Sequence, residues 1–163
     1  MSRGPSKLND VPEEWNRISE ALIGAAMEVH TILGPGLLER LYEQALAHEL
    51  ERRGIPYQRQ VPIRLRFKDI ELEGQVLDFV VADLLVVELK SVERVHEVHL
   101  SQLYSYMRSA RLPLGLLINF NVPHLKDGIF RRVLSRNTPV PSILLSQDLA
   151  PRPSAPSDTS AFS

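Results

Sequence analysis

The sequence predicts an α/β fold, on the border with α+β, in which helices flank a mixed central β-sheet. Two observations predict this class. Segments with the helical spacing of apolar residues are followed by apolar, β-branched runs of strand length. A further helical segment then separates two strand segments, which requires the chain to cross over the sheet. The expected order is two helices, three or four strands, a helix, a strand and a last short strand.

Two helices open the expected fold. The first covers residues 13–33, and its apolar face consists of Ile18, Leu22, Ala25, Val29 and Ile32. Gly34-Pro35-Gly36 ends this helix and begins the next one. The second helix runs to about residue 53, and its inward face is formed by Leu38, Leu41, Tyr42, Ala45 and Leu46.

Strand patterns follow the two helices. Residues 61–67 alternate apolar and polar side chains, which is the period of a half-solvated strand. Three further strand segments are expected over 70–73, 76–81 and 84–90. Residues 95–110 return to helical spacing, and residues 114–120 form a fully apolar strand. One turn around 124–127 precedes a last strand over 128–134.

Composition places the chain among ordinary globular proteins. It has 163 residues, of which 44% are hydrophobic and 24% charged, and its formal net charge is −1. This balance excludes a uniformly basic nucleic-acid coat protein. Cysteine is absent, which excludes disulfides, thiolate zinc sites and cysteine nucleophiles. No stretch reaches the roughly 18–20 apolar residues that span a bilayer, so we expect a cytoplasmic protein without membrane contact.

The two ends differ from the centre in composition. Residues 1–11 are small, polar and proline-containing, and residues 137–163 are rich in proline and serine. Such segments bury too little apolar surface to offset the entropy of ordering. We therefore expect a flexible N-terminus over 1–11, one folded domain over 12–136 and a largely disordered tail over 137–163.

Three charged residues, Asp78, Glu88 and Lys90, stand inside apolar strand segments. Glu88 and Lys90 are two residues apart and point to the same face of their strand. If the two segments form a hairpin, a three-residue loop sets Asp78 opposite Glu88, whereas a two-residue loop turns the carboxylates to opposite faces. The loop contains no glycine and does not decide the register. A surface ion pair between Glu88 and Lys90 at a strand end is the alternative interpretation.

Asp78 and Glu88 on one buried face repel each other unless a cation lies between them. A Mg²⁺ ion takes oxygen ligands from one or two carboxylates and keeps water in the rest of its shell. A neighbouring lysine can orient an attacking water or stabilise charge on a phosphate oxygen. The three residues together therefore indicate metal-assisted hydrolysis of a phosphate ester.

This D-x9-E-x-K arrangement resembles the PD-(D/E)xK nuclease superfamily, and other blocks extend the similarity over about residues 15–135. Gly36-Leu37-Leu38-Glu39-Arg40-Leu41-Tyr42 resembles the signature of the GxxExxY protein family within that superfamily. The resemblance implies a restriction-endonuclease-like core and phosphodiester hydrolysis with Mg²⁺ or Mn²⁺. By position it implies Asp78, Glu88 and the Leu89 carbonyl as metal ligands, Lys90 as the catalytic lysine, and Glu39 as a further member of the acidic cluster.

Other residues are candidates for binding the substrate. Gln102 and Tyr106 resemble the QxxxY element of RecB-like nucleases, which touches DNA, and His99 shares their helix face; a solvated helix would show the same polar stripe. Arg64 and Arg66 alternate onto one strand face, which suits phosphate backbones, although an edge strand guarded by charge looks identical. We expect DNA rather than RNA as the partner, bound through its backbone, and leave open a protein partner or a homodimer.

Two functions are compatible with these residues. The first is a metal-dependent nuclease, which is either active alone or silent until a partner binds. The second is a catalytically silent nuclease-fold module that binds nucleic acid or a protein. The presence of Asp78, Glu88 and Lys90 together favours the nuclease, because a decayed site usually loses one of them.

Overall fold

The computed structural model describes residues 11–134. The expected tail over 137–163 lies outside the described residues, as does the expected N-terminal segment except for Val11. No helix in the part of the chain that is described is long and apolar enough to cross a membrane.

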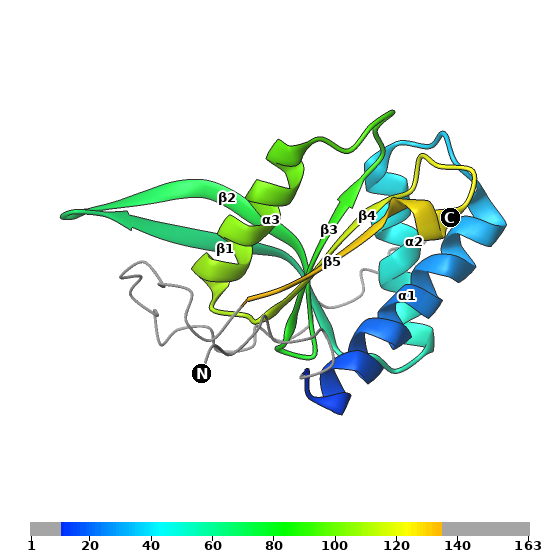
Figure 1. Ribbon diagram of the computed structural model, residues 1–163, viewed down its shortest axis with the longest axis horizontal. Coiled ribbons are helices and arrows are strands. Elements are labelled where there is room, and N and C mark those ends of the chain that lie inside the picture. Colours follow the sequence, from blue (N-terminus) through cyan, green and yellow to red (C-terminus); the bar gives the residue numbers. More distant parts are fainter. Residues whose placement is uncertain (1–10, 135–163) are drawn as a thin grey trace, which may run out of the picture.

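A five-stranded mixed sheet forms the centre of the structure (Figure 1). Its strands follow one another in sequence order across the sheet: β1 (Tyr57–Phe67), β2 (Ile70–Val81), β3 (Leu85–Lys90), β4 (Leu114–Asn119) and β5 (Ile129–Val133). Only β3 and β4 are parallel among these neighbours, and α3 (Glu97–Ala110) makes the crossover between them. The predicted α/β class with a mixed sheet flanked by helices is confirmed.

The helices lie in two layers on opposite faces of the sheet. α1 (Glu13–Leu33) and α2 (Glu39–Arg52) pack on one face, where Phe79 and Val87 join the core formed with Leu22 and Leu46. α3 packs on the other face through Leu103 and Met107, which meet a second set of strand residues: Val80, Val86 and Leu117. Because both faces are covered, all of β4 is buried and so is all of β3 except Lys90. A short 3₁₀ helix, η1 (Leu125–Gly128), connects β4 to β5.

The two expected segments 70–73 and 76–81 form one continuous strand, and β1 begins at Tyr57 rather than at Val61. Gly74, with φ of 112°, lies where we expected a break. A register shift between Ile63 and Leu65 places one extra residue on β2 there, so pairing continues past the glycine. The result is a long β1–β2 hairpin that projects well beyond the rest of the sheet (Figure 1).

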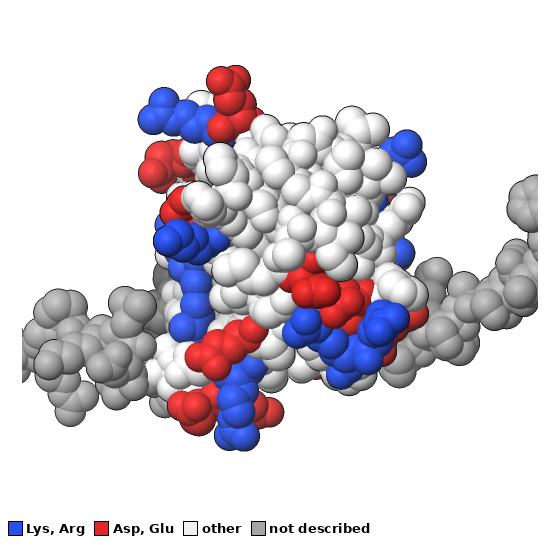
Figure 2. All heavy atoms as spheres, turned by 90° about the vertical axis from the view of Figure 1, so that its right-hand side faces the viewer, with Lys and Arg blue, Asp and Glu red and all other residues white. Residues whose placement is uncertain are grey.

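Two residues predicted to face inward are exposed. Ile32 is 71% exposed and Leu38 is 63% exposed. The apolar stripe of α1 continues to Ile32, but the buried residues of this helix end at His30. Leu38 lies in extended backbone just before α2 begins. Met27 and Leu33 are also exposed at this end of α1. Figure 2, which faces the right-hand side of Figure 1, shows a broad uncharged area in the upper half of that face.

Candidate active site

The β2–β3 hairpin sets two carboxylates face to face. Its register pairs Phe79 with Val87 and Val81 with Leu85, so the three-residue connection 82–84 is present and Asp78 lies opposite Glu88. The regular main-chain pairing of β2 with β3 ends at Phe79 and Val87. Beyond it, side-chain carboxylates accept the hydrogen bonds that main-chain carbonyls would accept in a regular sheet. The Asp78 N–H donates to Glu88 Oε1 at 3.1 Å, and the Leu89 N–H donates to Asp78 Oδ2 at 2.8 Å. Each carboxylate is thereby fixed by the backbone of the opposite strand.

Glu39, the first residue of α2, belongs to the same cluster. Its carboxylate accepts a hydrogen bond from the Ser91 N–H just beyond β3. The Ser91 hydroxyl in turn donates to the Leu37 carbonyl at 2.6 Å. These two bonds join the start of α2 to the end of β3, and a helix N-terminus favours the negative charge of Glu39.

Burial and mutual repulsion make the cluster difficult to ionise. Burial, followed by the charge of Asp78, raises the pKa of Glu88 to about 8. Burial also raises the pKa of Asp78 and that of Glu39. The Lys90 ammonium opposes all three shifts, so it lies close to each carboxylate. One lysine faces three carboxylates here, and a bound cation would complete the neutralisation.

Glu43 and Gln60 also lie at this site, and neither was predicted from the sequence. Glu43 Oε1 accepts from Arg59 Nε at 3.2 Å, from Arg59 Nη2 at 3.1 Å and from Gln60 Nε2 at 3.0 Å. Its charge raises the pKa of Asp78 and of Glu39. The i, i+4 spacing of Glu39 and Glu43 on one helix was the available signal.

The polar stripe of α3 faces the cluster. After burial, the charges of Glu88 and Asp78 raise the pKa of Tyr106, and the Gln102 side chain hydrogen-bonds to Tyr106. Burial and the neighbouring Lys90 lower the pKa of His99. His99 Nδ1 accepts a hydrogen bond of 3.0 Å from the His96 N–H. The structure therefore brings all three stripe residues to the side of the sheet that carries Glu88 and Lys90.

Arg64 and Arg66 lie elsewhere, on the projecting part of β1. Arg64 Nη1 is 3.6 Å from Glu71 Oε2, and 63% of the Arg64 side chain is exposed. Arg66 Nε donates to the Lys68 carbonyl at 3.0 Å. Both contacts stay within the hairpin, so these arginines are held away from the carboxylate cluster.

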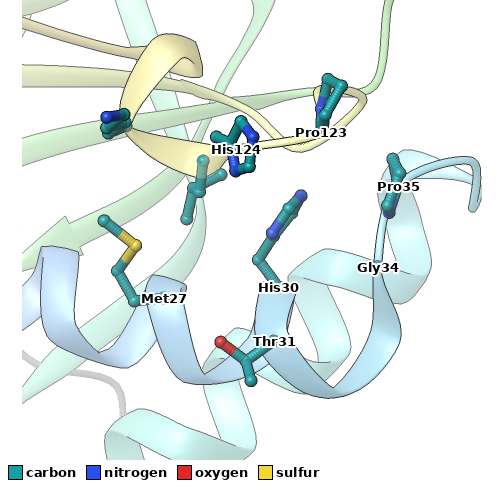
Figure 3. Close-up of a pocket in the computed structure, with 9 residues that line it drawn as sticks. Met27, His30, Thr31, Gly34, Pro35, Pro123 and His124 are labelled. Atoms are coloured by element: carbon teal, nitrogen blue, oxygen red, sulfur yellow. The ribbon is translucent and has the colours of Figure 1, made fainter.

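A pocket of about 450 Å³ lies between the C-terminal half of α1 and residues 123–126 (Figure 3). His30, which lines it, has Nε2 2.8 Å from the Val122 carbonyl oxygen. None of the carboxylates of the cluster contributes to its wall. The candidate active site is therefore the open end of β3, and this pocket is separate from it.

The donor set suits a hard divalent ion. Glu88 Oε1 and Asp78 Oδ2 each accept from a backbone N–H, and Glu88 Oε2 and Asp78 Oδ1, the latter 3.5 Å from Gln60 Nε2, are the potential metal ligands. Over residues 11–134, no group of three or more histidine, aspartate or glutamate side chains is arranged to hold a metal ion. An ion bound by two carboxylates, with a main-chain carbonyl such as that of Leu89 and water as the remaining ligands, fits this arrangement.

Residues 16–133 match the model of the PD-(D/E)XK nuclease superfamily. The match covers most of the chain and includes the strand pair and the helices that carry the acidic cluster. The chain therefore belongs to the PD-(D/E)XK nuclease superfamily, as the sequence resemblance had indicated. Comparison with curated proteins and with solved structures gave no significant match.

Proposed function

We propose that this protein is a metal-dependent nuclease that hydrolyses phosphodiester bonds of DNA with Mg²⁺ or Mn²⁺. The observation that carries the proposal is the opposed pair Asp78 and Glu88 at a buried strand end, with Lys90 beside them, in a chain of a nuclease superfamily. The signature from Gly36 to Tyr42, which includes Glu39, supports a place in the GxxExxY family.

Each residue has a distinct role in this proposal. Asp78 and Glu88, with the Leu89 carbonyl, would hold the ion, and Glu39 would add negative charge from the helix side. The bound ion would act as a Lewis acid on the phosphate and lower the pKa of a water molecule. Lys90 would donate hydrogen bonds to the attacking water or to a phosphate oxygen as charge develops there.

Substrate contacts are proposed on both sides of this centre. Gln102 and Tyr106 lie beside the carboxylates and would orient the sugar–phosphate backbone close to the cut. Arg64 and Arg66 on the projecting hairpin would bind phosphates further along the strand. Contacts of this kind recognise the backbone and the shape of the nucleic acid rather than its sequence.

The variant Lys90→Met tests the role of Lys90 in cleavage separately from metal binding. We expect the wild type to cleave single-stranded, double-stranded or branched DNA in the presence of Mn²⁺. The Lys90→Met variant should bind Mn²⁺ in a calorimetric titration and cleave at least about 100-fold more slowly, because it lacks the positioned donor. Lys126→Met, at an exposed lysine that lines the separate pocket between α1 and residues 123–126, is the matched control and should cleave like the wild type.

Asp78→Asn tests the metal site itself. Asparagine keeps an oxygen that accepts the Leu89 N–H but removes the charge, so Mn²⁺ binding should be lost while the fold is retained. A wild type that binds no Mn²⁺ would favour the silent module. Cleavage by Lys90→Met at the wild-type rate would show that the activity comes from another site or a contaminant.

A further inference from the structure

Gln60 has a backbone conformation that is unusual inside a strand. Five non-glycine residues within 11–134 have a positive φ, and four of them lie at a turn or a helix end: Lys68, Ala82, Asp83 and Arg111. Gln60, with φ of 49°, lies within β1, between the pairs Arg59–Phe79 and Val61–Leu77. The left-handed region is unfavourable for residues with a Cβ, and such strain persists where the surrounding structure or the function requires it.

Gln60 lies where the β1–β2 hairpin changes the face that it packs against the helices. Tyr57 packs in the core of α1 and α2, whereas Val61 and Ile63 pack with α3. These three residues would share a face in a regular strand, because side chains alternate with a period of two. β2 makes the same change of face, since Phe79 packs with α1 and α2 and Leu77 packs with α3, and on β1 the change occurs at Gln60. A glycine would adopt this backbone without strain, so the fold alone does not explain the glutamine.

The glutamine side chain makes the contact that a glycine lacks. Its Nε2 group lies 3.0 Å from Glu43 Oε1 and 3.5 Å from Asp78 Oδ1. Arg59 binds the same Glu43 oxygen, so the Gln60 amide lies between the Arg59–Glu43 ion pair and Asp78. The other Asp78 oxygen accepts from the Leu89 N–H. Both Asp78 oxygens are thus oriented, one from the β1 side and one from β3.

We propose that Gln60 is a positioning residue whose amide links the Arg59–Glu43 pair to Asp78 and fixes the orientation of that carboxylate for metal binding. The inference rests on the proposed function, which assigns Asp78 to the metal. It adds that this protein accepts a strained backbone within β1 in exchange for a correctly oriented ligand.

Gln60→Gly tests this inference, because it should move stability and metal affinity in opposite directions. Relief of the positive φ should raise Tm by a few degrees in the absence of metal. Loss of the amide should weaken Mn²⁺ binding by about tenfold, as is usual when a group supporting a metal ligand is removed. Lys68→Gly is the matched control, since Lys68 also has a positive φ, of 54°, but lies in the hairpin turn. It should raise Tm and leave the Kd for Mn²⁺ unchanged.

A Gln60→Asn variant adds a graded measurement, because asparagine tolerates the left-handed region but carries its amide on a shorter side chain. Its Mn²⁺ affinity should fall between those of the wild type and Gln60→Gly. A Kd for Gln60→Gly within about twofold of the wild-type value, or a Tm that falls with the affinity, would overturn the positioning role and leave the proposed nuclease intact. A wild type without Mn²⁺ binding would overturn both.

Discussion

The ionisation of Glu88 should make the stability of the folded chain depend strongly on pH. Glu88 is only 6% exposed, and its pKa is raised from the ordinary value of 4.5 to about 8. Between these values the folded chain holds a proton that the unfolded chain has released, so the free energy of unfolding decreases as the pH rises. The contribution is present in full below pH 4.5 and lost by about pH 8. At about 1.4 kcal/mol per unit, the total loss is roughly 4–5 kcal/mol.

The substitution Glu88→Gln should remove most of this dependence. Glutamine has nearly the same shape and keeps a side-chain oxygen for the Asp78 N–H, but it carries no charge at any of these pH values. The variant should be about as stable as the wild type at about pH 5 and more stable by roughly 3–5 kcal/mol at about pH 9. Part of the slope should remain, because the pKa values of Asp78 and Glu39 are raised as well.

Urea denaturation at several pH values, with a chelator present, measures this difference. Glu71→Gln is the matched control, because Glu71 is exposed on the projecting hairpin and its variant should follow the wild-type curve. Equal pH slopes for the wild type and Glu88→Gln would refute the reasoning, since the proton would then be held elsewhere. In the presence of Mn²⁺ at high pH, the wild type should gain stability and Glu88→Gln should gain little.

Two further predictions concern the elements that support the site. Asn119→Ala should destabilise the fold by roughly 2–4 kcal/mol in urea denaturation, because its buried amide makes three hydrogen bonds, with both backbone groups of Val92 and with the Asn121 N–H; a loss below about 1 kcal/mol would contradict this. Gly115→Ala should cost about 1–3 kcal/mol, since a methyl group there would overlap Met107 Sδ on α3. An unchanged Tm for Gly115→Ala would show that the Met107 side chain moves aside without cost.

The pairing of Asp78 with Glu88 was partly predictable from the sequence. Local patterning shows that Glu88 and Lys90 lie on the same face of their strand and that the segments 76–81 and 84–90 are otherwise apolar. The register does not follow from local patterning, because it depends on left-handed backbone at Ala82 and Asp83, with φ of 52° and 53°. A glycine in the loop would have indicated left-handed backbone, but neither alanine nor aspartate is a strong sequence signal for it. Beyond the paired residues 79–81 and 85–87, the hydrogen bonds between the two strands are accepted by the opposing carboxylates.

Gln60 and Glu43 were missed for a different reason. Gln60 lies before the alternating segment 61–67 that we read as the strand, and its left-handed backbone falls where the strand passes from one core to the other, between Tyr57 and Val61. Glu43 is held by residues 16 and 17 positions further along the chain. Local periodicity carries no information about such contacts between a helix and a strand.

The wrong predictions at Ile32 and Leu38 have a common cause. Spacing identifies which helix face is apolar, but it does not say how far along the helix the neighbouring elements extend. In this fold the elements packed against α1 bury its residues only as far as His30. The first residues of the connection to α2 are therefore left at the surface, together with the final member of the stripe.

The outer part of the projecting β1–β2 hairpin makes few contacts with the rest of the fold (Figure 1), so its length is not tied to the position of the acidic cluster. Leu65 still packs beside α3, but its strand partner Leu72 is 44% exposed, and Phe67 and Ile70 further out are 58% and 51% exposed; none of these three belongs to either core. Lengthening or trimming this arm at its tip would leave Asp78 and Glu88 where they are. In the proposed nuclease, the length of this arm would set how far from Asp78 and Glu88 the side chains of Arg64 and Arg66 meet the phosphate backbone.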